Sequence, residues 1–158
     1  MHQRLNIETI QASPVPPWEE RIQVSVEKGL QENAVAQRLE NSKAVLVATS
    51  TSVWKDVVRA GGAIQDTTKL DMPWNVDLIA SYTVTLGSRK KFNAYVAELV
   101  AIATAVRNLV GILQNWIVII LSSNLSALQA IKNPKHQSGQ YILQEIYKSV
   151  SSLRADNN

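Results

Sequence analysis

The sequence contains no cysteine, which excludes disulfide bonds, thiolate metal sites and a cysteine nucleophile. Charged side chains are sparse at 18%, and the formal net charge of +3 is too small to indicate nucleic-acid binding by itself. Long hydrophobic runs are missing too. The longest uncharged stretch, residues 108–131, is interrupted by glycine and polar residues, so its apolar part is too short to span a bilayer.

The N-terminal residues precede no apolar core of the kind that signal peptides carry. We therefore expect a cytoplasmic protein that has no membrane partner. The 158 residues, of which 46% are apolar, are enough for one domain with a substantial core.

The first part of the chain is proline-rich and favours an extended arm, with prolines at 14, 16 and 17. Trp18 is large enough to anchor this arm on the domain, or to fill a groove at a subunit contact. We expect an arm over residues 1–27, with a possible extra strand at 21–27, followed by a domain over residues 28–154.

Hydrophobic periodicity predicts an α/β fold. Alternating patterns and a β-branched run predict strands over residues 21–27, 43–49, 57–65, 76–86 and 116–121. Helical spacing predicts helices over residues 28–41 and 93–113, a helix from the N-cap Asn124 through Ile131, and a last helix from 138 or 139. We expect a turn at 51–56, a loop at 71–75, and burial of the 116–121 strand on both faces. Gly61 and Gly62 allow a bulge or a close approach.

Four segments resemble one family. They are Pro16-Pro17-Trp18-Glu19, Tyr95-Val96-Ala97-Glu98-Leu99, the run that begins at Ser122-Ser123-Asn124, and Asn133-Pro134-Lys135 with Ser138-Gly139-Gln140-Tyr141-Ile142-Leu143. They are similar to the ribonuclease H (RNase H) domain of fungal, LINE-type retrotransposon reverse transcriptases, and the resemblance covers most of residues 16–153. It implies three antiparallel strands, a helix, a parallel fourth strand and two further helices. The family's last strand and helix have no counterpart, so we expect a degenerate, C-terminally truncated copy.

The resemblance also implies a chemistry, which is cleavage of RNA in an RNA–DNA hybrid by two magnesium ions held by carboxylates. Glu98 matches the family's glutamate. Ser50 stands in place of the first aspartate, and Ser123 replaces the aspartate after the fourth strand. A serine hydroxyl is neutral and a poor magnesium ligand. We therefore expect no metal, no cofactor and no ribonuclease activity.

The former metal cleft, small and neutral, could instead take an apolar small molecule. In this hypothesis Glu98, Ser50 and Ser123 carry the chemistry. The ligand-binding residues are Trp54, Thr51, Ser122 and Asn124. A metal-free cyclisation or cycloaddition of fungal secondary metabolism would fit such a site, although the sequence leaves open whether the protein is an enzyme at all.

Three alternatives stay open. One is a non-catalytic nucleic-acid-binding module, with Arg89-Lys90-Lys91 as a weak remaining contact. Another is a dimerisation module, because the strand at 116–121 could leave an edge that residues 21–27 or a second copy would cover. The last is an inert retroelement fragment, in which Glu98 is only a structural residue and the serines fill former aspartate positions.

Overall fold

The computed structural model describes residues 8–25, 43–67 and 78–158. The described elements follow the order β1 (Ala44–Trp54), β2 (Val57–Asp66), β3 (Leu78–Ser88), α2 (Ala94–Leu109), β4 (Ile117–Leu121), α3 (Leu125–Lys132) and α4 (Gln140–Ala155). The helix expected at 28–41 and the loop expected at 71–75, with Trp74, lie outside the described residues.

The strands form one mixed sheet in the order β3-β2-β1-β4. The β1–β2 and β2–β3 pairs are antiparallel, and β4 runs parallel to β1 with Ala44 opposite Ile117 and Ala48 opposite Leu121. This confirms the expected α/β arrangement. The expectation that β4 is buried on both faces is wrong, because Ile117 is 41% exposed and the other four residues of β4 are only partly buried. Within the described residues β4 pairs with β1 alone.

The hairpin between β1 and β2 is tighter than the sequence indicated. The turn expected at 51–56 is reduced to Lys55 and Asp56, which have φ values of 46° and 67°, and Trp54 pairs with Val57. Two positive φ values in a two-residue loop match the twist of the flanking strands. Residues 51–54 therefore extend β1, and Trp54 reaches the hairpin tip.

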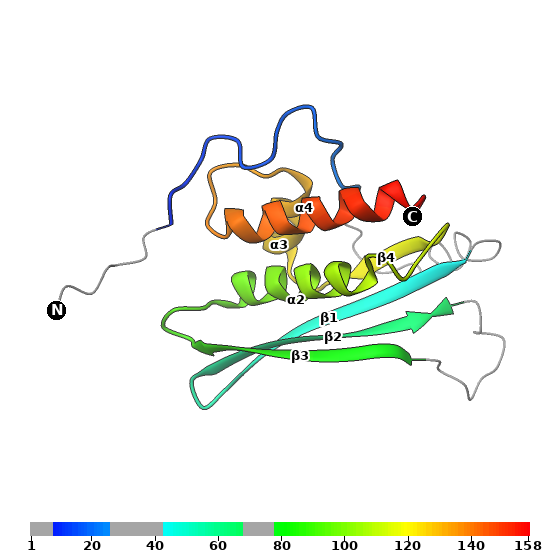
Figure 1. The fold of residues 1–158 in the computed structure, drawn as a ribbon. Coiled ribbons are helices and arrows are strands. Elements are labelled where there is room, and N and C mark those ends of the chain that lie inside the picture. Colours follow the sequence, from blue (N-terminus) through cyan, green and yellow to red (C-terminus); the bar gives the residue numbers. More distant parts are fainter. Residues whose placement is uncertain (1–7, 26–42, 68–77) are drawn as a thin grey trace.

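All described helices lie on one face of the sheet, with α2 between the sheet and α4 (Figure 1). Because α2 has neighbours on two sides, its buried stripe is wide and includes Leu99, Ile102 and Val106. It ends at Leu109 rather than at residue 113, and Gly111 takes a left-handed φ of 77°. On α4, Ile142, Ile146 and Leu153 are buried, and Val150 packs partly buried against the same core.

The N-terminal segment passes over the outer side of α4 (Figure 1). The strand expected at 21–27 is not formed over residues 21–25, which have no regular structure, and residues 26–27 lie outside the described part. Trp18 does not anchor the arm on the domain, since it is 85% exposed. Val15, which is 2% exposed, and Pro14 are buried instead. In the described part of the chain, no helix is long and apolar enough to cross a membrane.

Candidate functional site

The candidate site is built around Glu98 in the second turn of α2. Asn93 begins this helix by accepting a hydrogen bond from the Val96 backbone N–H at 2.9 Å. Glu98 lies one turn further on, on the face that packs on the sheet, and is only 2% exposed. A buried carboxylate is unfavourable unless it is hydrogen-bonded, so its partners define what the site can do.

Two hydroxyl groups, one from the middle of β1 and one directly after β4, satisfy one oxygen of Glu98. Thr49 on β1 donates its hydroxyl to Oε1 and also lies 3.2 Å from the Leu121 carbonyl oxygen. Ser122, directly after β4, donates to the same Oε1 at 2.6 Å. The Ser122 oxygen in turn accepts the backbone N–H of Asn124 at 3.2 Å. The carboxylate is thus tied to the β1–β4 pair by a continuous polar chain.

Tyr82 on β3 is electrostatically linked to the same carboxylate. Its hydroxyl donates to the Ala101 carbonyl oxygen at 2.6 Å, which connects the third strand to α2. Burial, and then the charge of Glu98, raise the pKa of Tyr82 from 10.0 to about 12. The Tyr82 ring passes so close to Gly62 that an added Cβ would lie 2.4 Å from the hydroxyl oxygen. The close approach expected at the glycine pair is therefore present.

The structure separates Ser50 from Glu98. Successive strand side chains point to opposite faces, and Thr49 faces α2, so Ser50 faces away from the helices. There Ser50 and Ser52, with Arg59 and Thr83, line a shallow cavity of about 230 Å³. Thr51 shares the Thr49 face and is half-buried.

The remaining expected site residues lie at different distances from the carboxylate. Ser123 is exposed, whereas its neighbour Ser122 contacts Glu98. Asn124 is occupied as the N-cap of α3, where its Oδ1 accepts the Ala127 backbone N–H at 3.0 Å, as the sequence predicted. Trp54 is 60% exposed, and five residues of strand place it about 17 Å from Thr49.

Thr49 is the contact that sequence reasoning missed. The signal was available in the alternation of β1, because Val45 and Val47 occupy core positions and residue 49 continues that face. The family motif points instead to the next residue, Ser50, which faces the other side of the sheet.

The residues present do not fit the carboxylate-held metal pair that the resemblance implies. Magnesium ions need several anionic or carbonyl oxygens that face a hydrated space. Here the carboxylate of Glu98 is buried, and the groups beside it are hydroxyl donors. Among the described residues, no group of three or more His, Cys, Asp or Glu side chains could hold a metal ion.

A second surface lies at the C-terminal end of β1, and we call it the hairpin-tip surface: Trp54, Lys55, Arg89, Lys90 and Lys91. Lys55 Nζ lies 4.4 Å from the centroid of the Trp54 ring. Arg89 donates its backbone N–H to the Asp56 carbonyl oxygen at 2.9 Å, which holds the β3–α2 connector against the hairpin. The surface combines an exposed indole with four cations.

The chain matches no protein-family model and no curated protein. It is similar in structure to the foamy viral protease-reverse transcriptase, which was solved with an RNA/DNA hybrid, at 13% identity and a TM-score of 0.52. The match covers 89% of this chain and 19% of the viral chain, so this chain spans only a small part of that protein.

Together with the sheet order and the parallel β1–β4 pair, this match decides the fold. The fold is RNase H-like. Two further similar structures are RNase H1 from the archaeon Halobacterium salinarum, at 10% identity and a TM-score of 0.46, and the N-terminal RNase H domain of rv2228c from Mycobacterium tuberculosis, at 13% and 0.47. The first match covers 70% of this chain and 77% of that one, and the second covers 73% and 76%.

Proposed function

We propose that this chain is an RNase H-like domain that does not cleave nucleic acid. The observation that carries the proposal is the closed state of Glu98, which is 2% exposed and whose Oε1 accepts the hydroxyls of Thr49 and Ser122. To bind a metal through Oε1, this carboxylate would have to lose two charge-assisted hydrogen bonds, each of which contributes about 1.5–3 kcal/mol. A metal at Oε2, the oxygen to which these hydroxyls do not donate, would meet only neutral side chains at the Ser50 and Ser123 positions. Neutral Ser50 and Ser123 would return little of that energy.

Metal titration tests this proposal directly. We expect isothermal calorimetry of the full chain with Mg²⁺ and Mn²⁺ to show no saturable binding at millimolar concentrations. Glu98→Gln is the matched control, because the amide oxygen can accept the same two hydroxyls while the negative charge is removed. Saturable binding by the wild-type chain that Glu98→Gln abolishes would contradict the proposal.

The small-molecule form of the proposal places a ligand against Ser122, Ser123 and Glu98 at the end of β4, without metal. The small neutral side chains there support it. Thermal-shift screening of apolar fungal metabolites tests it, with and without magnesium. A stabilising ligand that is indifferent to magnesium and lost in Glu98→Gln would support a repurposed pocket and open the question of metal-free cyclisation. Stabilisation that Glu98→Gln leaves unchanged would place the ligand elsewhere.

An origin in a fungal retroelement belongs to the same proposal and is supported by the motifs at residues 95–99 and 133–143. The neighbourhood of the gene is informative. Terpene cyclase, polyketide synthase or oxygenase genes beside it would favour a biosynthetic role, whereas flanking transposon sequence would favour a retroelement fragment.

A second candidate function is non-catalytic nucleic-acid binding, and the hairpin-tip surface favours it. An exposed indole offers a stacking platform, and the neighbouring cations can neutralise phosphates. Fluorescence anisotropy with an RNA–DNA hybrid measures this. We expect Lys90→Glu to weaken binding and to flatten its salt dependence, while Lys132→Glu on α3, which changes the net charge by the same amount, serves as the control. Equal effects from these variants would argue against this surface.

A further inference from the structure

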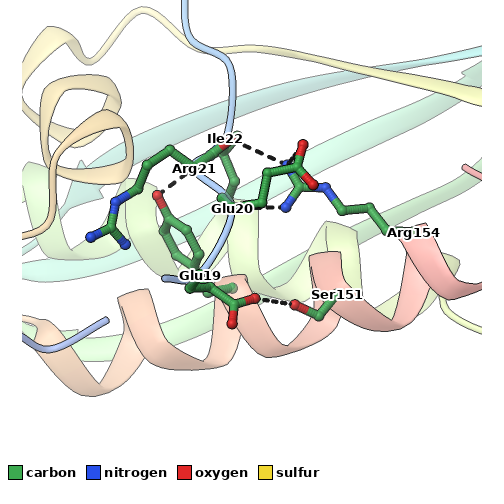
Figure 2. Close-up of polar contacts among 7 residues, drawn as sticks. Glu19, Glu20, Arg21, Ile22, Ser151 and Arg154 are labelled. Atoms are coloured by element: carbon green, nitrogen blue, oxygen red, sulfur yellow. Dashed lines mark hydrogen bonds and ion pairs between the residues drawn. The ribbon is translucent and has the colours of Figure 1, made fainter. Parts of the chain in front are cut away.

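The N-terminal arm is fastened to α4 along most of that helix. Near its start, the Glu8 carboxylate accepts the backbone N–H groups of Gly139 and Gln140 at 3.1 and 2.9 Å. At its far end, Ser151 donates to Glu19 at 2.5 Å, and Arg154 donates to the Glu20 carbonyl oxygen at 2.9 Å (Figure 2). The backbone between these points is therefore held at both ends.

Between these fastened ends the arm makes a tight turn that projects a tryptophan. Glu19 donates its backbone N–H to the Pro16 carbonyl oxygen at 3.1 Å, which closes a turn with Pro17 and Trp18 at its centre. Proline is favoured at the first central position of such a turn. Trp18 is 85% exposed, although burying an indole removes 150–250 Å² of largely apolar surface from water. A fixed backbone thus presents a large unpartnered apolar side chain.

A cavity of about 570 Å³ lies beside this turn, between the arm and α4. Pro14, Val15 and Pro16 form its arm side, and Tyr147 and Ala155 are among the α4 residues that line it. Trp18 does not line the cavity, so its exposed indole lies beside the open cavity without occupying it.

The rim of the cavity carries both signs of charge. Glu19 supplies a carboxylate from the arm, and Lys148 supplies an ammonium group from α4. A partner of a single charge sign would meet repulsion at one of them. A second copy of the same surface, turned about a two-fold axis, offers a cation where the first has an anion.

We propose that this surface is a self-complementary dimer interface, in which Trp18 of each copy enters the cavity between the arm and α4 of its partner. An isologous two-fold contact requires that a projecting side chain and the cavity that receives it belong to the same surface of one chain. Exposed tryptophans that enter a partner's pocket are frequent energetic centres of interfaces. The interface lies on α4, away from Glu98, so it is independent of the function proposed above.

Sedimentation equilibrium of the full chain tests the proposal from about 1 µM to about 1 mM, where dimers of moderate affinity dissociate. We expect the mass to rise from the monomer value of 17.5 kDa toward twice that value. Trp18→Ala is expected to raise the dissociation constant by about 30-fold or more. Trp54→Ala is the matched control, because Trp54 is also exposed but lies on the β1–β2 hairpin.

A second variant fills the cavity and leaves Trp18 unchanged. Ser152 is exposed and lines the cavity, so Ser152→Trp occupies the space without disturbing the core, and it should weaken the dimer as much as Trp18→Ala does. A wild-type chain that stays at 17.5 kDa throughout the range would overturn the proposal. Equal dissociation constants for Trp18→Ala and Trp54→Ala, or a Ser152→Trp dimer as tight as the wild type, would do the same.

Discussion

The two ends of the Thr49–Trp54 segment of β1 differ in exposure, aromatic character and charge. At Thr49 the strand contributes a hydroxyl to a buried carboxylate whose acceptor is already shared with Ser122. At Trp54 it ends in a 60% exposed indole with Lys55 above the ring. The first end is internal and polar, whereas the second is external, aromatic and cationic.

This difference shows which part of the RNase H-like fold presents polar and aromatic groups to solvent and which part buries them. The Glu98 cluster joins α2, β1 and the end of β4, so its hydrogen bonds stabilise the junction of three elements. Ser50, at the motif position next to Thr49, belongs to the opposite face of the sheet. The hairpin-tip surface makes no comparable contribution to the core. We therefore expect substitutions at the two ends to separate stability from binding.

The largest effect is expected from Glu98→Ala. It removes a buried side chain and leaves the Thr49 and Ser122 hydroxyls without their acceptor, so we expect the free energy of unfolding to fall by about 2–4 kcal/mol. Urea denaturation measures this. Glu98→Gln should lose much less, because the amide oxygen can accept both hydroxyls. Equal losses for the two variants would show that the hydrogen bonds contribute little.

A smaller effect is expected from Tyr82→Phe. Losing the hydrogen bond to the Ala101 carbonyl oxygen should lower the free energy of unfolding by about 1 kcal/mol at neutral pH. The raised pKa adds a pH dependence. The phenol ionises near 10.0 when unfolded and near 12 when folded, so its contribution is complete below pH 10 and is lost as the pH rises toward 12.

Denaturation curves at several alkaline pH values isolate this contribution. The stability advantage of the wild-type chain over Tyr82→Phe should shrink steadily as the pH rises from 10 toward 12. Comparing the two is necessary because burial and the charge of Glu8 also raise the pKa of Tyr95. A stability gap that stays constant through this pH window would contradict the link between Tyr82, its burial and Glu98.

The smallest effect on stability is expected from Trp54→Ala at the exposed end. Its indole contacts Lys55 rather than the core, so we expect a change within about 0.5 kcal/mol in the same urea experiment. If the hairpin-tip surface binds nucleic acid, this variant should lose affinity while Glu98→Gln keeps it. A stability loss comparable to that of Glu98→Ala would remove the contrast between the two ends.

The sequence was sufficient for most of the architecture, because hydrophobic period and capping residues are local signals. The N-cap at Asn124 and the start of α2 beside Asn93 follow from such signals. The tight β1–β2 turn was not predictable from propensity, since Lys55 and Asp56 take left-handed values without a glycine. Residues 21–25 alternate like a strand but lie in the arm that crosses α4, so tertiary contacts override their pattern.

The site was predictable only in part, because a motif identifies residues but not the face of the sheet to which their side chains point. The motif points to Glu98 and to Ser122, and the structure joins the two by a hydrogen bond, while the catalytic and ligand-binding roles expected for them stay predictions. Thr49 was omitted, and Ser50 was placed beside Glu98 although strand alternation points it to the other face. Which of two adjacent residues faces a helix depends on register, which a motif does not encode.

The most direct test of the central claim is an RNA–DNA hybrid cleavage assay on the full chain, with Mg²⁺ and with Mn²⁺. Glu98→Gln, purified in the same way, is run beside it. We predict no metal-dependent cleavage by the wild-type chain above the level of Glu98→Gln, because the remaining carboxylate is buried and already hydrogen-bonded. Metal-dependent cleavage by the wild type that Glu98→Gln abolishes would contradict the account.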